Sequence, residues 1–186
     1  SIIYPLNYDL QKDFEPIVGL FINANALVTN ASLNVKTIPQ LVAHAKANPG
    51  KLNYASQGNG SLSHVGTALL EQTTGIEMTH VPYKGSGPAI QDVLAGQVQV
   101  FMTTPPSVMQ HVQAGKLKAF AVTGKTRHPG LPNVPTTAEA GLAGFELEAW
   151  VGLFAPAGTP PTVIQTLTEK VKAALEVAGF KPEIAE

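Results

Sequence analysis

Between Lys51 and Thr123 the chain repeats one pattern: a short extended segment, a polar turn, a helical segment and a glycine. The helical segments carry apolar residues three and four positions apart, as in the run Leu62–Leu69, which is the period of a buried helical face. Strands that alternate with helices of about ten residues form right-handed crossovers in a mainly parallel sheet. The sequence therefore predicts an α/β fold, a doubly wound sheet with helices on both faces.

The expected elements can be placed by residue number. In this middle region the expected strands are 52–55, 78–82, 98–102 and 117–123, and the expected helices are 63–74, 87–95 and 106–114. One or two strands at 17–30 and a helix from Thr37 to Pro49 precede them. A short helix at 136–140, a strand at 146–154 and an amphipathic helix from Val163 to Leu175 follow.

Ligands of doubly wound sheets bind beyond the carboxyl ends of the strands, where the strand-to-helix loops gather. Three such loops, 56–61, 82–88 and 103–107, are rich in Gly, Ser and Thr. The first loop leads into a helix whose free N–H groups and dipole suit an anion. The candidate ligand-binding residues are Ser56, Gly58, Gly60, Ser61, His64, Tyr83, Lys84, Gly85, Thr103 and Thr104. The predicted ligand is a small acidic molecule.

Each of these residues also has a purely structural interpretation. Ser61 or Ser63 is a typical helix N-cap, and the glycines are typical of turns. His64 can cap its own loop, Tyr83 can pack at the rim, and Lys84 can be solvated. The convergence of three polar, glycine-rich loops at one edge of the sheet is what favours a binding site.

Charge and composition narrow the possible partners. Twelve basic and thirteen acidic side chains give a net charge of −1, and no basic run marks a nucleic-acid partner. No window reaches the ~18 apolar residues of a membrane-spanning helix, so the chain is not expected to be membrane-embedded. The absence of cysteine and of closely spaced histidines argues against a metal site. No cofactor is expected.

The two ends of the chain differ from its middle. Residues 1–16 lack periodicity, and a proline-rich loop at 124–135 precedes the strand that carries the single tryptophan, Trp150. The amphipathic helix after that strand needs a surface of its own, because the α/β middle already has its helical layers. We therefore expect an extended segment of a partial first lobe at 1–16, a ligand-binding second lobe with crossing strands at both ends at 17–150, and the C-terminal part of the first lobe at 151–186.

Four separated runs carry a specific resemblance: NPGKLNYASQGNGSLSH, THVPYKGSGPAIQDVLAGQV, AGKLKAFAVTGKTRHPGLPNVPTTAEAGL and WVGLFAPAGTP. In this order they resemble the Bug receptors, the TctC-like periplasmic solute-binding proteins of tripartite tricarboxylate transporters. The resemblance runs from about Tyr4 to Glu176. It implies two lobes of the type II periplasmic binding protein kind that close on a carboxylate, a binding protein and not an enzyme, a bacterial periplasmic location, and membrane transporter subunits as partners. The signal peptide of such a protein is not present in this chain.

The resemblance also bears on individual residues. It places residues 56–64 in the family's second-domain loop, which holds the distal end of the ligand, and residues 83–85 in the loop beside it. At Thr103 the family often has an acid that can pair with a ligand ammonium, a charge that threonine cannot supply. We therefore expect a di-, tri- or aromatic carboxylate. The Pro-Gly-Gly type loop of the family's first domain has no match here, which indicates that part of the first lobe lies outside this chain.

Rival functions remain to be weighed. A hydrolase that uses Ser61 and His64 is disfavoured, because neither Ser61 nor Ser63 stands in a Gly-x-Ser-x-Gly elbow. A nucleotide or phosphate binder is disfavoured by the lack of Gly-x-x-x-x-Gly-Lys-[Ser/Thr] and Gly-x-Gly-x-x-Gly. A ligand sensor that passes its bound state to a signalling partner stays open, because the sequence does not separate sensing from transport.

Overall fold

The computed structural model describes residues 5–177, which divide into two compact units, one of residues 24–148 and the other of the residues before and after them. The larger unit contains a five-stranded sheet. Its strands are β2 (Ala26–Asn30), β3 (Asn53–Ser56), β4 (Thr79–Pro82), β5 (Val100–Thr103) and β6 (Leu117–Val122), in the order β4-β3-β5-β2-β6. β3 runs parallel to β4 and β5, whereas β2 runs antiparallel to β5 and β6. The predicted mainly parallel sheet is confirmed, with β2 as the reversed strand.

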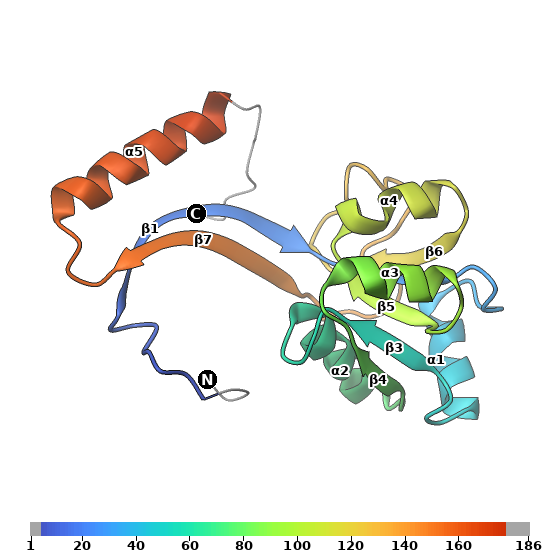
Figure 1. The fold of residues 1–186 in the computed structure, drawn as a ribbon. Coiled ribbons are helices and arrows are strands. Elements are labelled where there is room, and N and C mark those ends of the chain that lie inside the picture. The colour runs from blue at the N-terminus through green and yellow to red at the C-terminus, as the bar shows by residue number, and fades with distance from the viewer. Residues whose placement is uncertain (1–4, 178–186) are drawn as a thin grey trace. The chain divides into compact units, whose positions relative to one another are not determined.

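Four helices cover the two faces of this sheet: α1 (Ile38–Ala47), α2 (Leu62–Thr74), α3 (Ser86–Leu94) and α4 (Pro105–Gln113). Successive strand residues point to opposite faces. Tyr54 and Met102 therefore enter the core shared with α1 and α2, while Ala55 and Phe101 enter the core shared with α3 and α4. The predicted arrangement of helices on both faces is confirmed (Figure 1).

Local signals explain where the helices begin and end. Thr37 caps α1 by accepting a hydrogen bond from the Gln40 N–H at 3.3 Å, and Pro39 fits its first turn. Gly75 ends α2 in the left-handed region at φ 65°, where its N–H donates to the Glu71 carbonyl at 2.8 Å. Both ends follow the capping rules that the sequence analysis used.

Thr123 joins two residues near the ends of the larger unit, Asn25 and Leu147. Its hydroxyl accepts a hydrogen bond from the Asn25 N–H at 2.8 Å and donates to the Leu147 carbonyl at 2.5 Å. Its backbone N–H donates to the Asn25 carbonyl at 2.8 Å, and all of Thr123 is buried. Thr123, directly after β6, therefore links the residue that precedes β2 to the segment that leads into β7.

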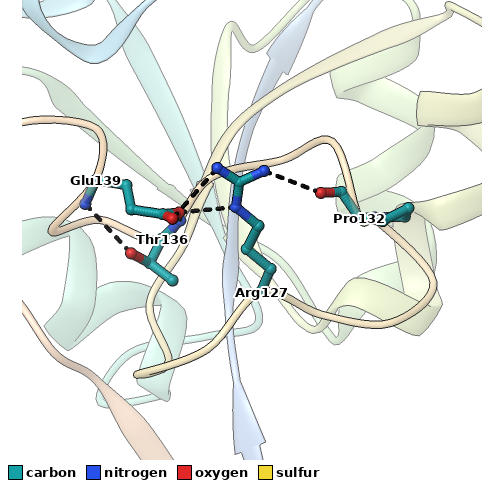
Figure 2. Close-up of polar contacts among 4 residues, drawn as sticks. All are labelled: Arg127, Pro132, Thr136 and Glu139. Atoms are coloured by element: carbon teal, nitrogen blue, oxygen red, sulfur yellow. Dashed lines mark hydrogen bonds and ion pairs between the residues drawn. The ribbon is translucent and has the colours of Figure 1, made fainter.

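The loop after β6 differs from the expectation at 136–140, where the predicted short helix is wrong. The residues form a hydrogen-bonded turn in which Thr136 and Glu139 bond reciprocally, with the Thr136 N–H donating to Glu139 at 2.8 Å and the Glu139 N–H donating to the Thr136 hydroxyl at 3.2 Å. Arg127 pairs with the same carboxylate at 2.8 and 3.2 Å and donates to the Pro132 carbonyl (Figure 2). Five residues offer too few intrahelical bonds to offset helix nucleation, so the capping pattern closes a turn instead.

The smaller unit contains β1 (Phe14–Ala24), β7 (Glu148–Pro156) and α5 (Pro161–Val177), with β1 and β7 paired in a two-stranded sheet. The Thr168 hydroxyl on α5 donates to the Ile17 carbonyl on β1 at 3.2 Å, and the Gly158 N–H donates to Glu15 at 3.1 Å. Trp150 on β7 is 65% exposed. Within residues 5–177, no helix has the length and apolar character that crossing a membrane requires.

Candidate functional site

The three polar loops lie at one edge of the sheet because β3, β4 and β5 are parallel. Their last residues are Ser56, Pro82 and Thr103, and Ser56 pairs with Pro82 in the register of β3 and β4. The Tyr83 N–H donates to the Ser56 carbonyl at 3.0 Å, which joins the first loop to the second. The structure thus gathers the loops where ligands of such sheets bind.

The first loop is shaped by two glycines and a buried serine. Gly58 and Gly60 adopt φ values of 123° and 77°, which L-residues with side chains rarely adopt. The Ser56 hydroxyl accepts a hydrogen bond from the Gly58 N–H at 3.1 Å and lies 2.6 Å from Nε2 of His80. Ser56 is fully buried, so its hydroxyl stabilises the loop from inside.

The hydroxyls of Ser61 and Ser63 lie at the N-terminus of α2. Ser61 is the N-cap, and its Oγ donates to the Gly58 carbonyl at 2.7 Å and accepts from the His64 N–H at 3.4 Å. Its Oγ is also 2.9 Å from Oγ of Ser63, which in turn accepts from the Gln57 N–H at 2.9 Å. The helix N-terminus therefore presents two coupled hydroxyls in the field of the helix dipole.

Gln57 links the three loops, and the sequence analysis did not include it. Its Nε2 donates to the Ser86 hydroxyl at 2.7 Å and to the Thr103 hydroxyl at 3.4 Å, and its Oε1 accepts from Ser63 at 3.5 Å. Ser86 is the first residue of α3, and Thr103 is the last residue of β5. In the sequence, Gln57 is marked only by its place between the end of a strand and a glycine. Its partners Ser86 and Thr103 are distant in the chain, so no local pattern indicates these contacts.

His64 and His80 stack on each other and bond to residues of the first loop. The Gly60 N–H donates to Nδ1 of His64 at 3.0 Å, and the His64 ring stacks on His80 with centroids 4.1 Å apart and planes 4° apart. Tyr54 stacks on the other side of His80 at 4.9 Å. Since Nδ1 of His64 accepts from a backbone donor, it is not placed to take a proton from Ser61. Ser61 and His64 are therefore not arranged as the nucleophile and base of a hydrolase.

The pKa of His80 is lowered, first by burial and then by the neighbouring His64. Between this lowered pKa and the ordinary histidine pKa of about 6.5, the unfolded chain therefore binds a proton at His80 that the folded chain does not bind. This contribution to stability is complete above that pH and is lost as the pH falls toward the lowered folded-state pKa. Glu71 acts in the opposite sense, because burial raises its pKa.

We expect His80→Gln to reduce the loss of unfolding free energy that acidification causes, because the variant removes the imidazole that resists protonation. The measurement is urea denaturation at about pH 7.5 and about pH 5.5, which bracket the ordinary histidine pKa. Equal acid sensitivity in wild type and His80→Gln would contradict the prediction.

In the second loop, the side chain of Ser86 bonds to Gln57, whereas the side chain of Tyr83 bonds to α3. The Tyr83 phenol donates to Asp92 on α3 at 2.7 Å, and burial, followed by the bond to Asp92, raises the pKa of Tyr83 to about 12. Lys84 is exposed, and Gly85 precedes α3 with φ 103°. This loop reaches the cluster through its backbone and through Ser86.

The third loop contributes one buried and one half-buried hydroxyl. Thr103 is fully buried, and its Oγ accepts from Gln57. Thr104 bonds within its own loop, with its Oγ 2.8 Å from Oγ of Ser107. Of the predicted residues, the structure therefore joins Ser56, Gly58, Gly60, Ser61, His64 and Thr103 in one hydrogen-bonded network, and it leaves the side chains of Tyr83, Lys84 and Thr104 outside it. Among residues 5–177, no group of three or more His, Asp or Glu side chains is placed to hold a metal ion.

Comparison with known proteins identifies the family. The model of the tripartite tricarboxylate transporter family receptor, TctC, matches residues 2–186. The chain belongs to this receptor family. It is 40% identical over 185 residues to a UPF0065 protein encoded between tcbD and tcbE in Pseudomonas sp. strain P51, a match that covers 98% of this chain and 54% of that protein. The chain thus spans about half the length of the curated relatives it matches.

Two solved structures show the receptor fold with small carboxylates. R. palustris Rpa4515 with adipate is 35% identical with a TM-score of 0.87, over 93% of this chain and 58% of that one. MatC from Rhodopseudomonas palustris with bound malate is 34% identical with a TM-score of 0.85, over 94% of this chain and 60% of that one. The resemblance to the Bug and TctC receptors is confirmed.

Proposed function

We propose that this chain is part of an extracytoplasmic solute-binding protein that captures a small di-, tri- or aromatic carboxylate in the periplasm and delivers it to a tripartite tricarboxylate-type transporter in the membrane. The observation that carries the proposal is the network of neutral donors at the N-terminus of α2, in a receptor family with relatives that hold adipate and malate. The carboxylate is the part of the proposal that these observations support most directly.

The chemistry of the cluster suits a carboxylate. Hydroxyls and a side-chain amide can each donate to a carboxylate oxygen, and the positive end of the α2 dipole favours the negative charge. Thr103 places no acid beside these donors, so a ligand without an ammonium group fits the site better than an amino acid does. The candidate residues from the sequence analysis remain the proposed ligand contacts, together with Ser63 and Ser86.

The division of the chain into two lobes is also part of the proposal. Residues 17–150 form the proposed ligand-binding second lobe, and residues 1–16 and 151–186 belong to the proposed first lobe. Affinity in a receptor that closes around its ligand comes from both lobes, because ordering and desolvation costs must be offset by contacts on both sides. We therefore expect this chain alone to bind more weakly than a complete two-lobed receptor.

The proposal is tested by thermal shift and titration calorimetry with adipate, malate, citrate, benzoate and glutamate. Two proteins are compared: this chain, and a chimera in which residues 24–148 replace the matching segment of the adipate-bound relative. We expect at least one carboxylate to raise the melting temperature of the chimera, because a ligand that binds only the folded state stabilises it. If every compound leaves both folded proteins unchanged, the carboxylate proposal is wrong.

Ser61→Ala is expected to weaken carboxylate binding in the chimera by about 1–3 kcal/mol, because a hydroxyl that meets a buried charged group is lost. The variant also removes an N-cap, which costs stability of about 1 kcal/mol. Thr37→Ala is the matched control, since Thr37 caps α1 outside the cluster. It should lower stability by a similar amount and leave the dissociation constant unchanged. Equal affinities in Ser61→Ala and wild type would remove Ser61 from the site.

A further inference from the structure

Gln57 is the side chain that reaches all three loops of the cluster. From the β3–α2 loop its amide nitrogen extends to Ser86 on α3 and to Thr103 at the end of β5, at 2.7 and 3.4 Å. Its amide oxygen faces Ser63 on α2 at 3.5 Å. Gln57 is half-buried, whereas Thr103, to which it donates, is fully buried. Gln57 is therefore the more accessible of the two residues.

Besides the positive end of α2 and the imidazole of His64, which accepts from the Gly60 N–H, the cluster offers neutral groups to a ligand. Within the loops 56–61, 82–88 and 103–107, Lys84 is the one ionisable cation, and it is exposed. The other donors are hydroxyls of Ser61, Ser63, Ser86 and Thr103. Hydrogen bonding between neutral groups and the ligand must therefore carry the selection on this side of the site.

A primary amide has a property that hydroxyls and charged groups lack. It offers two N–H donors on one side and a carbonyl acceptor on the other, and rotation about the terminal torsion exchanges the two. The N–H side can donate to a carboxylate, and the carbonyl side can accept from an amide or a hydroxyl. The partners of Gln57 are hydroxyls, which can themselves donate or accept, so either orientation keeps its contacts with Ser63 and Ser86.

We propose that Gln57 is a specificity-determining residue of this site, whose carboxamide contacts a polar end of the ligand and admits both carboxylate and carboxamide termini. The inference rests on the proposed carboxylate-binding function and deepens it by naming the ligand class. That class is small dicarboxylic acids together with their monoamides. An acidic side chain at position 57 would discriminate between diacids and monoamides, because it repels a ligand carboxylate and accepts a hydrogen bond from a ligand amide.

The test compares adipate with adipamate and malate with its monoamide in the chimera described above. In wild type, we expect the diacid and the monoamide to bind with dissociation constants within about tenfold of each other, because the amide can satisfy both. In Gln57→Glu, the diacid should lose at least about tenfold in affinity while the monoamide loses less, because the new carboxylate faces a like charge. In Gln57→Met, both should weaken, because the thioether does not donate a hydrogen bond.

Gln99→Glu is the matched control. Gln99 lies just before β5, and its side chain bonds to Gly96 and Asn53, away from the three loops. The variant adds the same charge to the same unit, and it should keep the wild-type ratio of diacid to monoamide affinity. Far-UV circular dichroism checks that all four proteins are folded.

The outcomes separate the two proposals. If wild type binds adipate or malate and Gln57→Glu keeps the wild-type ratio, the role of Gln57 is wrong and the carboxylate function stands. A wild type that binds a diacid but rejects its monoamide also overturns the role of Gln57. If folded wild type binds none of these probes or of the wider carboxylate panel, both proposals fall together.

Discussion

Replacing Phe101 by Ala is expected to lower the free energy of unfolding by about 3–5 kcal/mol, which is the range for a large aromatic removed from a core. Phe101 is fully buried on β5, between β3 and β2, and it packs in the core shared with α3 and α4. Two neighbours of that core, Val28 and Val108, are also fully buried. They belong to a strand and a helix that cannot close the cavity without moving, so relaxation recovers little of the loss.

The measurement is urea denaturation followed by far-UV circular dichroism, with hydrogen exchange of the β3 and β5 amides as a local readout. Trp150→Ala is the control, because this aromatic is 65% exposed in the other unit, and its replacement should change stability by about 0.5 kcal/mol or less. Tryptophan fluorescence is unsuitable, since the single tryptophan reports on β7 and not on the sheet around Phe101. A loss below about 1 kcal/mol would mean that Phe101 is not central to this core.

Thr103→Asp is expected to reduce the affinity for a dicarboxylate by at least about 1.4 kcal/mol, or tenfold. Thr103 ends β5 and accepts from Gln57, so a carboxylate at this position would lie beside the donors proposed to hold the ligand. Two like charges about 5 Å apart repel by roughly 3 kcal/mol at the effective dielectric of a protein site. The same substitution should favour a ligand that carries an ammonium group, such as glutamate.

Thr103→Asn separates the charge from the change of shape, because asparagine has the same size as aspartate and no charge. Titration calorimetry of both variants in the chimera should show a larger loss for Thr103→Asp than for Thr103→Asn with malate or adipate. Thermal denaturation without ligand measures the cost of burying an acid at a fully buried position, which is a separate effect. Unchanged or higher dicarboxylate affinity in a folded Thr103→Asp would place the pocket elsewhere.

Much of the fold could be predicted from the sequence because the local signals agree with the tertiary structure. Apolar periodicity placed α2 and α5, and glycine positions such as Gly75 and Gly115 marked where helices end. The predicted short helix at 136–140, closed by Gly141, is wrong because Thr136 and Glu139 bond to each other and close a single turn. The reversed direction of β2 lay beyond local reasoning, since strand direction depends on pairing with β5 and β6.

The candidate site was predicted in outline and not in detail. Gly58, Gly60 and Ser61 were found because glycines and a capping hydroxyl have local signatures at a strand-to-helix junction. The bond of Ser56 to His80 joins residues 24 positions apart, and the contact of Gln57 with Thr103 joins residues 46 positions apart. No local pattern indicates such contacts, because they arise only when parallel strands bring their loops to one edge.

The position of β2 between β5 and β6 has a consequence for the order in which the larger unit folds. β2 ends at Asn30, yet its two neighbours in the sheet begin only at Val100 and Leu117. β2 therefore stays unpaired until most of the unit has left the ribosome, and the loops that must close are long. We expect β3 and β4, joined by α2, to pair early, and the insertion of β2 between β5 and β6 to limit the rate of folding.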